Sequence, residues 1–188
     1  CISDWIGVIK GFTFQGNSTP AARITDQKAM ELGACYSWVI EDCTFNNFDK
    51  AVEIYFGLNC TLANLRISQQ THTGILGRHG NWTGASVNNS AFNANRIEKC
   101  RIYNGDNSYT SLHLLGADQT VVKECISEGF NPQYNFVYDE NSCTGVVTNT
   151  FENIWLESNG GQITPNTGFY IKFRNSMFLK NIQRVHPN

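Results

Sequence analysis

Acidic, histidine and lysine side chains interrupt or follow several short apolar segments of this sequence. The residues and their segments are Glu53 in AVEIYF, His113 in SLHLL, Asp139 after NFVY and Lys172 in FYIKF. Neighbouring side chains of a strand point to opposite faces. If the apolar residues of these segments face a core, the four polar side chains lie on an outer face.

Carboxyl groups on such a face suggest glycoside hydrolysis, which needs two of them about 5 to 10 Å apart, one protonated and one ionised. We predict this spacing for Asp139 with Glu140, or for Asp139 with Glu128 from the preceding turn, and we place His113 on the strand beside Asp139. The candidate catalytic residues are therefore Asp139, Glu140, Glu128, Glu53 and His113. The alternative is a solvated outer face with ordinary charges.

Polar segments between the apolar ones combine aromatic rings with Asn, Asp and His. Exposed rings stack on sugar faces, and the polar groups hydrogen-bond to hydroxyls, so these segments favour a carbohydrate-binding groove. The candidate substrate-binding residues are His79, Trp82, Asp106, Tyr109, Tyr134 and Lys172. Trp82 also has a structural alternative, since its ring can pin its own loop to the body of the protein.

A short pattern that recurs seven times indicates the elements that position these residues. It reads as an aliphatic residue, a variable one, a bend residue, an apolar residue, a variable one and usually another apolar residue. The apolar residue after the bend is in turn Phe12, Cys43, Leu65, Cys100, Cys125, Ile154 and Ile182, at intervals of 22 to 35 residues. A helical solenoid would keep a tighter period, so the repeat predicts strands joined by turns of different length.

The bend position of the repeat holds residues suited to a sharp turn. Its members are Gly11, Asp42, Asn64, Lys99, Glu124, Asn153 and Asn181. Gly and Asn enter the left-handed backbone region most easily and Asp follows them, whereas Lys99 and Glu124 fit less well. A turn at this position leaves the apolar residues on both sides facing inward.

These segments together predict an all-β fold, a single-stranded right-handed parallel β-helix of about seven coils with three short strands each. Coils about 4.8 Å apart would place His113 about 10 Å from both Glu53 and Lys172. We expect one β-helix domain over 1–188, with loop insertions at 16–37 and 77–94, the first containing a short helix around Ala29–Leu32. The missing end caps and the start at Cys1 suggest a fragment of a longer chain.

The seven cysteines are an odd number, so at least one thiol is free or pairs outside the chain. They are evenly spread, unlike those of a compact disulfide scaffold. We expect Cys43, Cys100 and Cys125 to act as small apolar groups in an interior ladder. Neither a CxxC motif nor zinc-type spacing to histidine occurs, so no metal and no cofactor is predicted.

Composition excludes several classes of partner. Charged residues make up 16% of the chain and the net charge is −2, which gives no electrostatic case for nucleic acid or for an anionic membrane. Nothing approaches the apolar run of about 18 residues that a membrane span needs, so no membrane insertion is expected.

The Asn-rich bend position resembles the short turn between the second and third sheets of the pectate-lyase-like superfamily of right-handed β-helices. The resemblance covers roughly Ile6 to Val185. The superfamily's enzymatic signatures are incomplete here. A calcium-dependent lyase would need clustered Asp with a nearby Arg, and a polygalacturonase would need an Asp-Asp pair, which is absent. Only Gly77-Arg78-His79-Gly80 and Tyr170-Ile171-Lys172 approach the polygalacturonase motifs.

Within that superfamily, the uneven coils and high Asn content look most like viral tailspikes and receptor-binding spikes. The resemblance implies a homotrimer at an extracellular or virion surface, alongside other virion proteins, that binds and often cleaves host polysaccharide. Trp155 falls at an outward position and suggests contact with another chain, although its column also holds Arg66, Arg101 and Gln183. The alternatives are a free polysaccharide lyase, hydrolase or epimerase, and a purely structural β-helix of a virion appendage or an adhesin.

Overall fold

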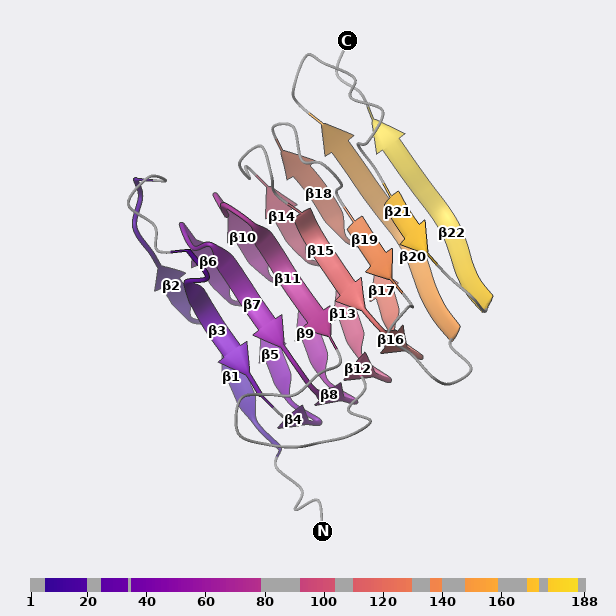
Figure 1. The fold of residues 1–188 in the computed structure, drawn as a ribbon, viewed down its shortest axis with the longest axis horizontal. Coiled ribbons are helices and arrows are strands. Elements are labelled where there is room, and N and C mark those ends of the chain that lie inside the picture. Colours follow the sequence, from indigo (N-terminus) through magenta and orange to yellow (C-terminus); the bar gives the residue numbers. More distant parts are fainter. Residues whose placement is uncertain are drawn as a thin grey trace.

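The computed structural model describes residues 6–19, 25–33, 35–78, 92–103, 110–129, 136–139, 148–158, 169–172 and 176–185. Within these ranges the chain consists of strands and turns, without a helix, and its strands pair in parallel (Figure 1). The strands belong to three sheets, which we label A, B and C. The predicted all-β parallel solenoid is confirmed.

Sheet A contains twelve strands. They are β1 (Val8–Lys10), β2 (Thr13–Gln15), β5 (Val39–Glu41), β6 (Thr44–Asn46), β9 (Thr61–Ala63), β10 (Arg66–Ser68), β13 (Arg96–Glu98), β14 (Arg101–Tyr103), β17 (Val121–Lys123), β18 (Ile126–Gly129), β20 (Thr148–Ser158) and β22 (Ser176–Val185). Most come in pairs separated by one bend, whereas β20 runs through its bend without a break.

Sheets B and C contain the remaining strands. Sheet B contains β3 (Lys28–Leu32), β7 (Lys50–Ile54), β11 (Thr73–Arg78), β15 (Thr110–Leu115), β19 (Phe136–Asp139) and β21 (Phe169–Lys172). Sheet C contains β4 (Cys35–Tyr36), β8 (Gly57–Leu58), β12 (Phe92–Asn93) and β16 (Ala117–Asp118). From β1 to β17 the chain passes repeatedly from sheet A to B to C and back to A, so sheet A gains a pair of strands per coil and sheets B and C gain one strand each (Figure 1).

The predicted bend position adopts the left-handed backbone at six of its members. The φ angles are 74° at Gly11, 54° at Asp42, 52° at Asn64, 55° at Lys99, 54° at Glu124 and 53° at Asn153. From Gly11 to Glu124, the amide of each bend residue donates a hydrogen bond to a carbonyl of the next coil, such as that of Lys99 to Lys123 at 3.0 Å. These bonds help to offset the strain that Lys and Glu incur in this conformation.

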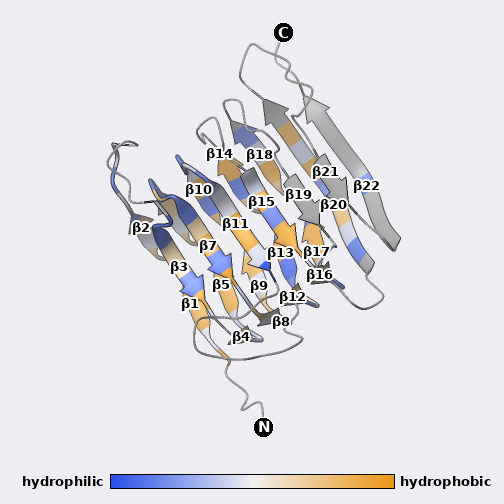
Figure 2. Ribbon diagram, viewed as in Figure 1, coloured by the Kyte–Doolittle hydropathy of each residue, from blue (hydrophilic) through white to orange (hydrophobic). Residues whose placement is uncertain are grey.

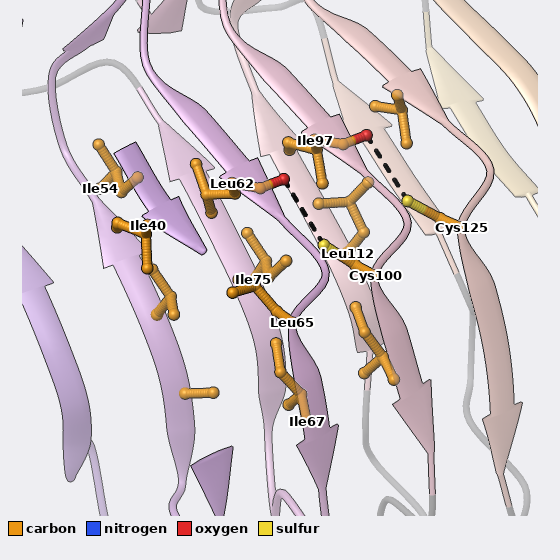
Figure 3. Packing of buried hydrophobic residues seen from close by; sticks show 14 of the residues in the cluster. Ile40, Ile54, Leu62, Leu65, Ile67, Ile75, Ile97, Cys100, Leu112 and Cys125 are labelled. Atoms are coloured by element: carbon orange, nitrogen blue, oxygen red, sulfur yellow. Dashed lines mark hydrogen bonds between the residues drawn. The ribbon is translucent and has the colours of Figure 1, made fainter. Parts of the chain in front are cut away.

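Apolar residues from successive coils fill the interior, and hydrophobic segments recur from strand to strand (Figure 2). The predicted interior ladder is confirmed at Cys43, Leu65, Cys100, Cys125 and Ile154, all buried. Figure 3 shows the thiols of Cys100 and Cys125 directed at the carbonyls of Leu62 and Ile97, at 3.7 and 3.6 Å.

Two details of the prediction are wrong. Phe12 is 58% exposed instead of interior, because β1 and β2 are the end strands of the pairing series and no described strand covers their outer edge. The segment around Ala29–Leu32 forms strand β3 instead of a helix, because pairing of Met30 with Val52 continues sheet B. Both β3 and β4 therefore lie inside the predicted 16–37 insertion.

Candidate functional site

Sheet B contains three of the residues that the sequence singled out for catalysis, Glu53, His113 and Asp139. The register runs from Glu31 to Glu53, Leu76 and His113 on successive strands. One strand separates Glu53 from His113, as the prediction of about 10 Å requires. The next strand places Val137 beside His113, so Asp139 lies two residues farther along, and its register partner on β21 is Lys172.

Other predicted site residues are not brought together. Glu128 lies in β18 of sheet A, with Tyr103 as its register partner, and Asp139 lies in sheet B. The remaining candidates fall outside the described residues: Glu140, His79, Trp82, Asp106, Tyr109 and Tyr134.

Contrary to the prediction, Glu53 is not exposed on an outer face of the sheet. Its side chain is only 1% exposed, because three cations cover it: Lys28 Nζ lies 3.1 Å and Lys50 Nζ 3.8 Å from Oε2, and Arg78 Nε lies 3.6 Å from Oε1. Asp26, Glu31 and Tyr55 surround these cations. We call these seven residues the Glu53 cluster.

The Glu53 cluster balances its own charge, with three carboxylates against three cations. The guanidinium of Arg78 lies 4.3 Å from the centroid of the Tyr55 ring, a cation–π contact. Burial lowers the pKa of Lys28, but hydrogen bonds to Glu31 and Glu53 outweigh it and raise the pKa above its usual value. With Glu53 buried at its centre and its charges balanced, the cluster acts as a structural network.

A groove of the opposite character follows the bend position on the outside of sheet A. One cavity of about 320 Å³ is lined by Asn64, Leu65, Arg66, Lys99, Cys100, Arg101, Glu124 and Ile126. A second, of about 290 Å³, is lined by Asp42, Cys43, Thr44, Asn64 and Arg66. The two share Asn64 and Arg66, so they adjoin along the stack. We call them together the bend groove.

Three cations of the bend groove have no acidic partner among the residues that the structure describes. Arg66 on β10 and Arg101 on β14 are register partners, and both are exposed. Within the described residues neither these two nor Lys99 forms an ion pair. Like charges on adjacent strands repel each other. The groove thus keeps an electrostatic cost that an anion would relieve.

Neighbouring charges along the same side of the stack are paired. Lys10 binds Glu41 at 2.7 Å, Lys180 binds Glu152 at 2.8 Å, and the one acid that lines the larger cavity, Glu124, lies 3.3 Å from Lys123. The unpaired cations are therefore a local feature of two adjacent coils.

An aromatic ring continues the arginine column. Arg101 is followed in register by Ile126 and then by Trp155, which is 37% exposed. The outward column thus runs from cations to an apolar side chain and an indole. Aligning the sequence repeats places Arg66, Arg101 and Trp155 in one column, but it reveals neither the hollow nor the missing counter-ions.

Among the described residues, no group of three or more His, Cys, Asp and Glu side chains is arranged to hold a metal ion. The described part of the chain also contains no helix long and apolar enough to cross a membrane. Comparison with protein-family models, with curated proteins and with solved structures finds no match to this chain.

Proposed function

We propose that this β-solenoid binds an acidic polysaccharide in the bend groove, as the glycan-binding part of a spike-type protein. The observation that carries the proposal is the stacking of Arg66 on Arg101, both exposed and without a counter-ion among the described residues. A guanidinium binds a carboxylate or sulfate through two parallel hydrogen bonds. Two of them on neighbouring coils suit the repeated anionic groups of a polymer better than a single small anion.

The shape of the site favours an extended ligand. The adjoining cavities continue from coil to coil at the strand spacing of about 4.8 Å, so a chain can lie along the stack. Trp155, two strands beyond Arg101, offers a partly exposed ring for stacking against a sugar. The resemblance to tailspikes supports a glycan rather than another polyanion.

The described residues favour glycan binding over glycan cleavage as the proposed function. Glu53, a candidate acid, is covered by its three cations, and Glu128 lies in a different sheet from Asp139. Cleavage would add a depolymerase activity. Purified protein would then release oligosaccharides from the polymer it binds, and replacing both Asp139 and Glu140 would abolish the release.

Affinity measurements at low salt test the binding proposal. We expect a carboxylated or sulfated polysaccharide to bind, a neutral dextran not to bind, and the affinity to fall as salt increases. Arg66→Gln or Arg101→Gln should weaken binding about ten-fold or more, since a charge-assisted hydrogen bond contributes about 1.5–3 kcal/mol. Neither change should lower the midpoint of urea unfolding, because each removes a repulsive contact.

Arg96→Gln is the matched control, because Arg96 is exposed on β13 but does not line the groove. If Arg96→Gln lowered the polysaccharide affinity as much as the groove variants do, the effect would come from overall charge, and the bend groove would not be the binding site. Equal affinity for single-stranded DNA would contradict the glycan specificity. If Trp155→Ala dissociates an oligomer while glycan binding is retained, the ring belongs to a subunit interface instead.

A further inference from the structure

Two thiols meet at the corner where sheet C passes into sheet A. Cys35 begins β4 on the first coil, and Cys60 follows the left-handed residue Asn59 on the second. Both are buried, and their Sγ atoms lie 3.4 Å apart. Both are free thiols in this structure.

The same corner of later coils is bridged by asparagine side chains. Asn95 accepts a hydrogen bond from the amide of Cys60 at 2.8 Å and donates to the carbonyl of Gly57 at 2.9 Å. Asn149 makes the same two contacts, with the amide of Thr120 and the carbonyl of Ala117, both at 2.9 Å. Each asparagine thus joins its own coil to the preceding one.

The strand register shows that Cys35 and Cys60 occupy the positions of Gly57 and Asn95 one coil earlier. Cys35 is the partner of Gly57, and Cys60 precedes Thr61, which pairs with Arg96 directly after Asn95. Cys60 therefore stands where Asn95 and Asn149 stand in later coils, and its Sγ lies 3.6 Å from the carbonyl of Cys35. At this joint two sulfur atoms replace the amide bridge.

Other cysteines are arranged differently. Cys100 and Cys125 occupy the same position directly before adjacent strands about 4.8 Å apart, and each thiol is directed at a backbone carbonyl, that of Leu62 for Cys100 and that of Ile97 for Cys125. A disulfide needs Cβ atoms about 3.5–4.5 Å apart and converging side chains. Cys35 and Cys60 bring their Sγ atoms to 3.4 Å of each other, so their side chains converge.

We propose that Cys35 and Cys60 are an oxidisable dithiol, which hydrogen peroxide converts into a disulfide that covalently joins the first coil to the second. The hydrogen bond with Cys35 lowers the pKa of Cys60 to about 7, with help from backbone amides of the turn and against the effect of burial. The same hydrogen bond, together with burial, raises the pKa of Cys35. Cys60 is therefore the thiol that ionises first and attacks the oxidant.

The reaction proceeds in two steps. The Cys60 thiolate attacks one oxygen of the peroxide, the O–O bond breaks, and the departing hydroxide takes up a proton as water, which leaves a sulfenic acid on Cys60. Cys35 then attacks Cys60 Sγ, the S–S bond forms and the S–O bond breaks, with release of a second water. Each sulfur loses one electron overall, and the peroxide is reduced to two waters.

The test is to treat the reduced, folded protein with hydrogen peroxide, block remaining thiols with iodoacetamide and digest with trypsin without reductant. Cleavage after Lys28, Lys50 and Arg66 puts Cys35 and Cys43 on one peptide and Cys60 on the next. We expect the two peptides to be joined by a link that a reductant removes. The link should be lost in Cys35→Ser and Cys60→Ser and retained in Cys43→Ala and Cys125→Ala.

A sulfenic-acid probe gives a second readout. Cys35→Ser should leave Cys60 as the residue that the probe labels, because the resolving thiol is gone. If the link persists in Cys35→Ser, if it forms only in urea, or if the folded wild-type protein gives none, the proposal is wrong. The result is independent of glycan binding, since neither cysteine lines the bend groove.

Discussion

The Glu53 cluster and the bend groove are both rich in charge, yet they are built in opposite ways. Glu53 is almost fully buried, with three cations within 4 Å, and the cluster as a whole holds three carboxylates and three cations. Arg66 and Arg101 are exposed, adjacent and of the same sign. The cluster satisfies its own electrostatics, whereas the groove leaves a charge for something else to satisfy.

The difference teaches that charge alone does not mark a site. A buried carboxylate is tolerated only with partners, because an unpaired buried ion costs several kcal/mol. Exposed cations need no such compensation, so two of them side by side on adjacent strands lower the stability of the fold only slightly. For these residues, the missing counter-ion is a better sign of ligand binding than the presence of an acid.

The largest effect that would separate the two regions is expected from Glu53→Gln. The change leaves Lys28, Lys50 and Arg78 without their central anion, which should lower the free energy of unfolding by about 3–5 kcal/mol. Urea unfolding measures the loss. Glycan affinity should not change once the variant is kept below its unfolding transition.

Glu98→Gln is the control for that variant, since Glu98 is a half-buried acid of β13 without an ion pair in the described part of the chain. It should change stability by less than about 0.5 kcal/mol. If Glu53→Gln proved as stable as the wild type but lost glycan cleavage, the cluster would be a catalytic centre instead of a structural one.

An intermediate effect, in the opposite direction, is expected from Lys99 in the lining of the bend groove. Lys99 has a φ of 55°, a conformation that costs Lys more than Asn. Lys99→Asn should therefore raise the free energy of unfolding by about 0.5–1 kcal/mol. The same change removes a cation from the groove, so affinity for the acidic polysaccharide should fall. A gain in stability with a loss of binding would show that the groove is not optimised for folding.

Lys123→Asn controls for the loss of a lysine, because Lys123 lies in β17, immediately before the bend residue, and is not among the left-handed residues. It should give no gain in stability. An equal gain from Lys123→Asn would assign the effect to charge, and the backbone explanation would fail.

The bend position and the interior ladder could be predicted from the sequence because they depend on local rules. A left-handed turn favours Gly and Asn, and an inward position favours apolar residues, so both recur in the repeat. The second series of left-handed corners, at Ser37, Asn59, Ala94 and Gln119, was not predicted. Its residue types carry no common signal, since inter-coil hydrogen bonds impose the conformation there.

The candidate site was less predictable because it depends on register between distant segments. Alternation correctly turned Glu53 outward, but it could not show that Lys28, Lys50 and Arg78 converge on it from three strands. The Ala29–Leu32 segment lacked strand residues, and pairing with β7 overrode its helical tendency. Likewise, the meeting of Cys35 with Cys60 follows from the corner geometry and not from their spacing.

The smallest effect is expected at the rim of the cluster, and it depends on pH. Asp26 is 57% exposed; its hydrogen bond with Lys50 lowers its pKa, and Coulombic attraction to Lys50 and Lys28 adds to this. A carboxylate with a lowered folded-state pKa stabilises the protein above its usual pKa of about 4, and the contribution disappears as the pH falls through the folded value. Because the pair is exposed, Asp26→Asn should cost only a few tenths of a kcal/mol at neutral pH.

Urea unfolding across a pH series tests this contribution, and the wild-type and Asp26→Asn curves should converge in acid. Asp42→Asn makes the same change in the groove, where hydrogen bonds from Asn64 and Lys10 also lower the pKa of the carboxyl. The stability of Asp42→Asn should also converge with that of the wild type in acid, since Asn suits the left-handed backbone at that position. A gap between wild type and Asp26→Asn that stays constant with pH would mean that the side chain acts through packing or through its neighbours' hydrogen bonds. The charge of Asp26 would then not contribute to the stability of the Glu53 cluster.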